Sequence, residues 1–451
     1  MERKIDEYLL EWKNRPRKNC LLIKGARQVG KTYSIDKFGR SNYDTYIYIN
    51  FETDKEKWRI FDGDLDIKTL EKRISAMFPD LRMIPGKTLI FLDEIQNCPN
   101  ARVALKPFSL DGRFDVVASG SLLGLNFKEV SSYPVGYETE VEMYSMDFEE
   151  FLWALGYGKD FTEDIRTHVR NREKIDDFVL GVVEERFRWY IATGGMPRAV
   201  EQFVETNNFH YVLEAQKDIV SGYLNDISKY AVGPALSGVG SCFRSIPIQL
   251  AKKNKKFVFT EIEDKKGVGL REYEGSLMWL YDAGIINYCH NLRQPALPLA
   301  SNVMQNSFKV YLRDTGLLVS MMETGIQFAI LDNDLLINEG GIMENVAADL
   351  LAKQGYKLTY FETKQTLEVD FILNIKGLAV ALAIKSGNNT KSKSLGVVMS
   401  KYGVKRGMKF GKMNVGTDGA VECYPLFALA FIDDAWNVPL KVDTGKVNTC
   451  K

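Results

Sequence analysis

The sequence predicts an α/β protein whose N-terminal part is a doubly wound, mainly parallel sheet. Three observations predict this class. Short apolar runs alternate with helical patterns between residues 18 and 145, the pattern G-x-x-x-x-G-K-T follows the first run, and a later run ends in two adjacent acids. Such alternation is typical of βα units, in which helices cover parallel strands. The strands are expected at residues 20–23, 45–51, 89–92, 114–119 and 139–143.

The loop after the first strand has the composition of a phosphate-binding loop. Gly25, Gly30, Lys31 and Thr32 occupy the four required positions, and a helix is expected to start near Lys31. Glycines let successive N–H groups point at phosphate oxygens, lysine reaches the β and γ phosphates, and threonine can bind magnesium. An ordinary glycine turn is the alternative. The other residues predicted to bind nucleotide in this loop are Ala26, Arg27, Gln28, Val29 and Tyr33.

A second polar site follows the third strand. Asp93 is expected to support magnesium, because the carboxyl ends of parallel strands lie beside the phosphate loop. Glu94 is placed to act as the general base toward water, so Glu94 and Lys31 are the predicted catalytic residues. Solvated acids at the end of a strand are the alternative. Ser119, with Ser121 as its substitute, is expected to sense the γ phosphate, although a serine-glycine turn explains it equally well.

A mainly helical part is expected to follow the sheet. Residues 146–235 have helical apolar spacing, interrupted by two glycines before Pro197, and are expected to form a lid over the nucleotide. Arg198 in this part is expected to face phosphate or a neighbouring subunit, with simple solvation as the alternative.

The next part has the rhythm of a small winged-helix unit, over residues 236–299. One helix is expected to start at Ile246, and a longer one covers residues 270–284 ahead of a strand. The basic run at residues 252–256 is expected to contact a nucleic-acid backbone or to be a solvated turn.

In the C-terminal part, the sequence predicts a helix that leads into a sheet. Glu344, Asp370 and Lys385 follow the order of acids and lysine in a magnesium nuclease, where carboxylates hold the ion and lysine positions the water. The acid expected two positions before the lysine is absent, because Ala383 stands there. We therefore expect a degenerate nuclease site. The division of the chain is then 1–145, 146–235, 236–299, 300–435 and a tail at 436–451.

Composition limits the function classes. The chain has 451 residues, which suggests about three domains. Lysine plus arginine and aspartate plus glutamate both number 59, so no global field favours nucleic acid or a membrane surface. No apolar stretch reaches ~18 residues and no signal peptide is apparent, so we expect a cytoplasmic protein without a membrane partner. The six cysteines form no CxxC pair and are expected to be thiols, and the three histidines have no metal-ligand spacing.

The order of these motifs resembles a prokaryotic family of AAA-type P-loop ATPases that carry a C-terminal domain of unknown function, DUF4143. Five later blocks strengthen the resemblance. They are D-F-E-E-F at 147–151, G-G-M-P-R-A-V at 194–200, Y-L-N-D-I-S-K-Y at 223–230, F-K-V-Y-L-R-D-T-G-L-L at 308–318, and E-V-D-F-I-L with I-K-S-G at 368–373 and 384–387. The resemblance implies an ATPase core with ATP and Mg²⁺ as ligands, a winged-helix section and a C-terminal domain similar to restriction endonucleases.

Two departures from this family matter. Its glycine-arginine pair before the last core strand is replaced here by residues 133–137, Y-P-V-G-Y, and Ala383 removes the nuclease acid. Because an arginine finger can raise the rate ~10³-fold, hydrolysis is expected to be slow.

Three functions follow as hypotheses. The leading one is Mg-dependent ATP hydrolysis coupled to movement of the winged-helix and nuclease-like domains. The alternative is a DNA-binding regulatory module that uses nucleotide as a switch with little turnover, and an active magnesium nuclease is the third. The sequence leaves open whether DNA or a protein is the partner of the C-terminal half, and whether the chain forms an oligomer.

Overall fold

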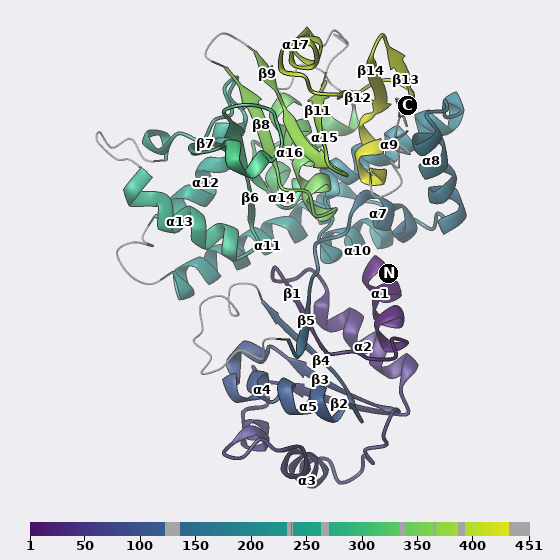
Figure 1. The fold of residues 1–451 in the computed structure, drawn as a ribbon, viewed down its shortest axis with the longest axis vertical. Coiled ribbons are helices and arrows are strands. Elements are labelled where there is room, and N and C mark those ends of the chain that lie inside the picture. The colour runs from purple at the N-terminus through teal and green to yellow at the C-terminus, as the bar shows by residue number, and fades with distance from the viewer. Residues whose placement is uncertain are drawn as a thin grey trace, which may run out of the picture.

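The structure is a computed structural model that describes residues 1–121, 136–231, 236, 238–262, 270–333, 339–363, 367–386 and 393–432. In Figure 1 the N-terminal sheet and the helices up to residue 111 lie in the lower part, and the helices and sheets that follow residue 147 lie above them. The expectations for residues 133–135, for Gly387 and for the tail at 436–451 lie outside the described residues.

The N-terminal part is a five-stranded sheet in the order β2-β3-β4-β1-β5, with every neighbouring pair parallel. Each strand overlaps the run from which it was expected, so the predicted parallel α/β core is confirmed. The strands are β1 Cys20–Gly25, β2 Thr45–Asn50, β3 Thr88–Asp93, β4 Asp115–Ser121 and β5 Glu138–Glu142.

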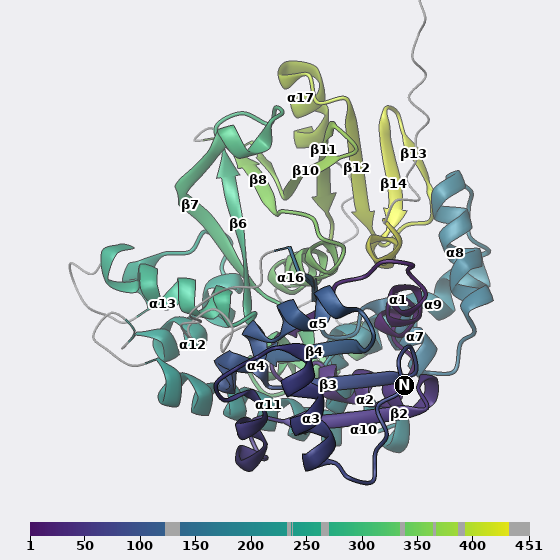
Figure 2. The same ribbon diagram turned by 60° about the horizontal axis from the view of Figure 1, so that its bottom comes forward.

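Helices cover both faces of this sheet, as Figure 2 shows. Side chains alternate along β1: Leu21 and Ile23 pack in one buried cluster with α1 and α2, whereas Leu22 packs in another with α3, α4 and α5. This period of two is what a strand buried on both faces requires. The helices are α1 Lys4–Lys13, α2 Lys31–Asn42, α3 Ile67–Met77, α4 Pro99–Val103 and α5 Leu105–Asp111.

The part expected to be helical is confirmed as helical. Its helices are α7 Phe148–Ala154, α8 Lys159–Asn171, α9 Asp177–Thr193, α10 Pro197–Thr206 and α11 Phe209–Tyr230. The two glycines of the G-G-M-P block separate α9 from α10, and Pro197 is the first residue of α10. The N–H of the first helical residue has no acceptor within the helix, so a proline there costs no helical hydrogen bond, and its fixed φ angle favours the start of a helix.

The helix expected to start at Ile246 begins earlier, so that expectation was wrong. It is α12, Val239–Leu250, and Ile246 lies in its second half. Proline favours a helix start, but the buried residues Val239, Cys242, Phe243 and Ile246 form one apolar stripe that stabilises the longer helix through packing. The second expected helix is α13, Leu270–Asp282.

Two smaller sheets form the C-terminal half, in the orders β7-β6-β8-β9 and β10-β11-β12-β14-β13. Their strands are β6 Ile286–Leu292, β7 Val303–Leu312, β8 Thr359–Glu362, β9 Glu368–Val369, β10 Phe371–Ile375, β11 Leu378–Ile384, β12 Arg406–Gly411, β13 Gly416–Asp418 and β14 Val421–Pro425. The helices are α14 Thr315–Ser320, α15 Ile326–Leu331, α16 Glu339–Lys353 and α17 Lys393–Tyr402. The expected boundary at 299/300 falls between β6 and β7, which pair with each other.

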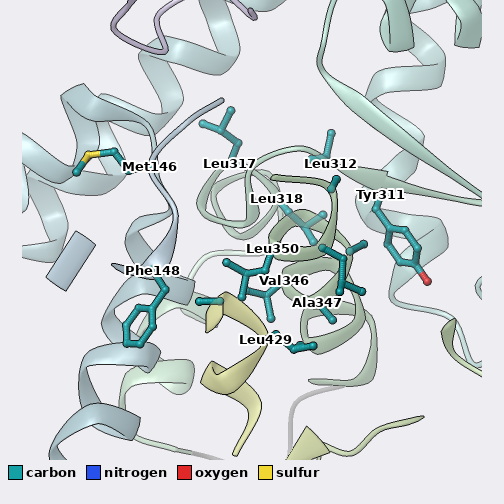
Figure 3. Packing of buried hydrophobic residues seen from close by; sticks show 14 of the residues in the cluster. Met146, Phe148, Tyr311, Leu312, Leu317, Leu318, Val346, Ala347, Leu350 and Leu429 are labelled. Atoms are coloured by element: carbon teal, nitrogen blue, oxygen red, sulfur yellow. The ribbon is translucent and has the colours of Figure 1, made fainter. Parts of the chain in front are cut away.

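One buried cluster extends from the N-terminal sheet into the C-terminal half. Figure 3 shows Phe148 of α7 in one buried cluster with side chains of α14, α16 and the short 3₁₀ helix Leu426–Phe431. Phe148 also lies 6.2 Å from Phe427, centroid to centroid. The two halves therefore share a core.

Among the described residues, none of the helices combines the length and the apolar character needed to span a membrane. The five described cysteines are buried free thiols.

Gly195 of the G-G-M-P block joins the helical part of the chain to α14 through its backbone N–H. The Gly195 N–H donates to Asp314 Oδ2 at 2.8 Å, and Asp314 also caps α14 through the Leu317 N–H. A Cβ added at Gly195 would overlap the carbonyl oxygen of Met146. Only glycine fits this close approach of two backbones.

Gly195→Ala is expected to lower the midpoint of thermal unfolding, because overpacking against backbone costs about 1–3 kcal/mol. Gly181→Ala is the matched control, since Gly181 lies within α9 and an added Cβ there meets nothing within 4 Å. Alanine in place of that helical glycine is expected to keep or raise the midpoint. Equal midpoints for both variants would contradict the proposed role of the contact.

Candidate phosphate-binding site

The loop between β1 and α2 has the curled backbone that a phosphate-binding loop requires. Gln28 and Gly30 have positive φ angles of 66° and 96°, and α2 begins directly after Gly30. A Cβ on Gly25 would overlap the carbonyl oxygen of Met143, so glycine is required where the loop leaves the sheet. Alternation of left-handed and right-handed residues turns N–H groups toward one side of a loop.

Lys31 is a buried cation inside this loop. Its side chain is 6% exposed, and Nζ donates to the carbonyl oxygens of Gly25 at 3.1 Å and Ala26 at 2.8 Å. Burial lowers the pKa of Lys31 to about 8, with Arg27 acting in the same direction and Glu94 and Asp93 opposing it. Carbonyl oxygens carry no net charge, so an anion that reaches Nζ would be strongly favoured.

Asp93 collects hydrogen bonds from several elements at the carboxyl end of the sheet. It accepts from Thr32 Oγ1 at 3.1 Å, from Ser119 Oγ, and from the Glu94 N–H at 3.1 Å. Thr32 comes from α2 and Ser119 from β4. The structure therefore brings together Thr32, Asp93 and Ser119, which the sequence singled out from three separate segments.

Two further partners of Asp93 were missed in the sequence. Tyr48 donates its hydroxyl to Asp93 Oδ2 at 3.0 Å, and Asn50 Nδ2 donates to the same oxygen at 3.3 Å. Both come from β2, where Asn50 is the register partner of Asp93. The alternation of polar Tyr48 and Asn50 with buried Ile47 and Ile49 was the available signal, but the strand order needed to use it was not known.

Glu94 lies beside this group in a tight turn. Its φ is 51°, its carboxylate accepts a hydrogen bond from Gln96 Nε2, and burial raises its pKa. Gln96 Nε2 also lies 3.5 Å from Ser121 Oγ, so Ser121 is connected to Glu94 through Gln96. Gln96 was not singled out in the sequence, because a glutamine after a strand has many ordinary explanations.

Arg3 is a fourth residue that sequence reasoning missed. Its guanidinium is buried and donates to the carbonyl oxygens of Val29 at 3.0 Å and Tyr144 at 2.9 Å, and it pairs with Glu150 at 3.0 Å. It thus fixes the phosphate loop to the D-F-E-E-F block. No local pattern around Arg3 could have indicated contacts so distant in the sequence.

Two predicted residues lie apart from the group. The Tyr33 side chain is 62% exposed. Arg198 forms an ion pair with Asp218 at 2.7 Å, and both side chains are more than half exposed. A solvated arginine is therefore the better interpretation of Arg198.

The predicted nuclease acids lie in a different place, in the C-terminal half. Glu344 is buried and pairs with Lys309 at 3.1 Å and Lys255 at 2.9 Å, and Tyr311 donates its hydroxyl to it at 2.9 Å. Asp370 accepts from the Ile384 N–H at 2.7 Å, and burial together with Glu344 raises its pKa to about 7.

Lys385 does not share these contacts. It lines a separate pocket together with Glu184, Arg188 and Lys412. Lys255 and Lys309 are the lysines that contact Glu344, and the sequence did not indicate them. Within the described ranges no group of three or more His, Cys, Asp or Glu side chains is arranged to hold a metal ion.

Family models match three parts of the chain. Residues 17–152 match the family model described as an AAA domain, and residues 184–327 and 339–427 match two domains of unknown function, DUF8612 and DUF4143. The first and last of these matches confirm the resemblance found in the sequence.

Similar proteins extend the comparison. An uncharacterized protein of Methanocaldococcus jannaschii is 28% identical over 132 residues, which cover 29% of this chain and only 27% of that protein. The Orc1 protein of Aeropyrum pernix in complex with DNA is 15% identical, with 73% of this chain and 91% of that chain covered and a TM-score of 0.28. AMPPCP-bound DnaA from Aquifex aeolicus is 14% identical, with 61% and 75% covered and a TM-score of 0.27.

The buried Lys31 charge predicts a pH-dependent stability. Burial lowers its pKa from 10.5 in the unfolded chain to about 8. The loss of folding free energy caused by the buried charge is therefore complete below pH 8, decreases as the pH rises, and is absent by about pH 10.5. Lys31→Met is therefore expected to raise the free energy of unfolding by roughly 3 kcal/mol at pH 7 and by little at pH 10.5. Denaturant unfolding at both pH values tests this, with the half-exposed Lys37→Met on the same helix as control. The same gain at both pH values would contradict it.

Proposed function

We propose that the protein binds Mg-ATP at the loop of residues 25–33 and hydrolyses it. The observation that carries this proposal is the buried Lys31 ammonium at the start of a helix, whose Nζ donates to the neutral carbonyl oxygens of Gly25 and Ala26. A phosphate group supplies the negative charge that such a position favours, and the α2 dipole acts in the same direction. ATP rather than GTP rests on the family resemblance.

The neighbouring side chains fit a magnesium ion. Thr32 and Asp93 present oxygen atoms, which magnesium prefers, and their hydrogen bond holds the two side chains together. Mg-ATP would supply the transferable phosphoryl group and a cation that neutralises its charge. Tyr48 and Asn50 keep Asp93 oriented toward this position by bonding the same carboxylate oxygen.

Glu94 is the residue we assign as general base. Its raised pKa brings it closer to the range in which a carboxylate accepts a proton effectively near neutral pH. Gln96 holds the carboxylate, and the turn at Glu94 directs its backbone away from β3. Ser119, bonded to Asp93, is the γ-phosphate sensor in this proposal.

Nucleotide state is proposed to act on the C-terminal half through β5. Gly25 packs against Met143, and the adjacent Glu142 pairs with Arg313 at 2.6 Å. Arg313 precedes Asp314, which accepts the Gly195 N–H. A shift of the loop would therefore be passed to a charged contact between the two halves.

We also propose identities for the C-terminal units. The order α12, α13 and the antiparallel β6/β7 pair supports a winged-helix unit. In the nuclease-like domain, the Lys255 and Lys309 ammonium groups neutralise Glu344 where a nuclease would hold a cation. The missing acid at Ala383 adds to this, so we propose that the domain does not cut nucleic acid.

The basic run favours the ATPase over the DNA-binding alternative. Lys252 pairs with Glu261 at 2.8 Å, Lys255 with Glu344 at 2.9 Å, and Lys256 with Glu362 at 3.6 Å. Lysines that are already paired offer less net charge to a phosphate backbone.

Because the described cysteines are thiols, we propose a reducing compartment such as the cytoplasm.

Magnesium-dependent phosphate release is the first activity to measure. Glu94→Gln is expected to lower kcat by about 10²–10⁴-fold while it keeps ATP binding, because the general base is lost. Lys31→Ala is expected to abolish ATP binding in titration calorimetry. Glu52→Gln, an exposed carboxylate just after β2, is the control and should match wild type. Full activity in Glu94→Gln would exclude its role as base, and no ATP binding in wild type would refute the function.

Supercoiled plasmid DNA with Mg²⁺ tests the C-terminal domain. We expect no cleavage by wild type, since Lys255 and Lys309 already pair with Glu344, the acid that would have to hold Mg²⁺. Ala383→Glu is expected to remain inactive as well, because Lys309 stays paired with Glu344. Cleavage that is lost in Asp370→Asn would overturn this part of the proposal.

A further inference from the structure

The end of α11 lies against the phosphate loop through one arginine. Arg27 Nη1 pairs with Asp226 Oδ1 at 2.7 Å, and Arg27 Nη2 lies 3.4 Å from the Tyr230 hydroxyl. The Tyr223 hydroxyl donates to the Arg27 carbonyl oxygen at 3.1 Å. Tyr223, Asp226 and Tyr230 stand at i, i+3 and i+7, so they share one face of the helix. All three belong to the Y-L-N-D-I-S-K-Y block, whose residues take no part in the proposed hydrolysis.

This contact is extensive on the α11 side. Tyr223 is buried, and a Cβ added at Gly222 would lie 3.2 Å from Gln28 Nε2 of the same loop. The Arg27 guanidinium also lies 5.5 Å from the centroid of the Tyr230 ring. The last two turns of α11 therefore pack directly against the phosphate-binding loop.

The Arg27–Asp226 ion pair is open to competition. The two side chains are 31% and 17% exposed, so an anion in solution can reach the guanidinium. Burial raises the pKa of Asp226 even though Arg27 opposes this, which means that its ionised carboxylate is not fully stabilised. A phosphate carries more charge than a carboxylate and accepts two guanidinium hydrogen bonds, so it is the stronger partner for arginine.

Arg27 belongs to the same loop as Lys31, four residues before it. Asp226 and Tyr230 hold its guanidinium beside this loop, and its charge acts together with burial to lower the pKa of Lys31. A triphosphate paired with Lys31 therefore lies within the field of Arg27. Without a ligand, Asp226 is the acid that holds this second cation.

We propose that the Arg27–Asp226 ion pair distinguishes triphosphate from diphosphate: a γ phosphate takes Arg27 from Asp226 and releases the end of α11, whereas ADP leaves the pair closed. Asp226 is then a positioning residue for Arg27. The inference rests on the proposed ATP site and specifies how that site controls the helical part of the chain.

Two nucleotide affinities test the inference. We would measure Mg-AMPPCP, a non-hydrolysable ATP analogue, and Mg-ADP by titration calorimetry. Asp226→Asn removes the competitor and is expected to strengthen AMPPCP binding about threefold to fivefold, with ADP unchanged. Arg27→Gln is expected to weaken AMPPCP binding about tenfold, again with ADP unchanged. Asp218→Asn is the matched control, because Asp218 is another α11 carboxylate paired with an arginine, Arg198, away from the loop.

Hydrogen–deuterium exchange of wild type tests the release of α11 without any substitution. Residues 223–230 are expected to exchange faster with Mg-AMPPCP than with Mg-ADP or without nucleotide. In Asp226→Asn they should exchange faster even without nucleotide, whereas Asp218→Asn should behave as wild type. These outcomes would support the inference.

The opposite outcomes separate the two proposals. If wild type binds and hydrolyses ATP, but Asp226→Asn changes both affinities equally or neither, and exchange does not depend on the γ phosphate, the inference is overturned and the ATPase proposal stands. If wild type binds neither nucleotide, both are overturned. An Asp226→Asn variant that fails to fold would leave the wild-type exchange and Arg27→Gln to decide.

Discussion

The candidate site depends on a positive charge that is buried before any ligand arrives. Lys31 is the first residue of α2, and its ammonium donates to two neutral carbonyl oxygens of its own loop. Such a charge destabilises the free protein, and neighbouring groups are arranged around it without neutralising it directly. Asp93 is engaged by Thr32, Ser119, Tyr48 and Asn50, and is thereby held in place. The site stores this free energy and recovers it when an anion binds.

Sequence reasoning identified the parts of the site that follow from local pattern. Lys31 and Thr32 follow the loop after β1, Asp93 ends β3 and Ser119 lies near the end of β4, and parallel strands bring such ends to one edge of a sheet. Tyr48 and Asn50 required knowledge that β2 lies beside β3. Arg3 required a contact with Glu150, 147 positions away, and no periodicity reports a pairing of that kind.

The fold shows the same limit. All five strands of the N-terminal sheet were expected, because apolar runs flanked by polar residues define strands locally. The start of α12 was misplaced, because Pro247 resembles a first-turn proline and its tertiary packing could not be seen. Lys255 and Lys309 reach Glu344 from a connection and from β7, so the charge balance of that cluster also depends on tertiary structure.

The shared core has a consequence for how the chain can be made. Trp12 and Leu21, near the beginning, belong to the same buried cluster as Phe427 to Ile432, near the end of the described residues. During synthesis on the ribosome, Phe148 and Phe187 of the helical part emerge long before Phe427, against which both rings pack. The apolar surface of α7 and α9 that faces Phe427 therefore stays uncovered until the 3₁₀ helix at 426–431 has been made, and exposed apolar surface of this kind favours aggregation of an incomplete chain.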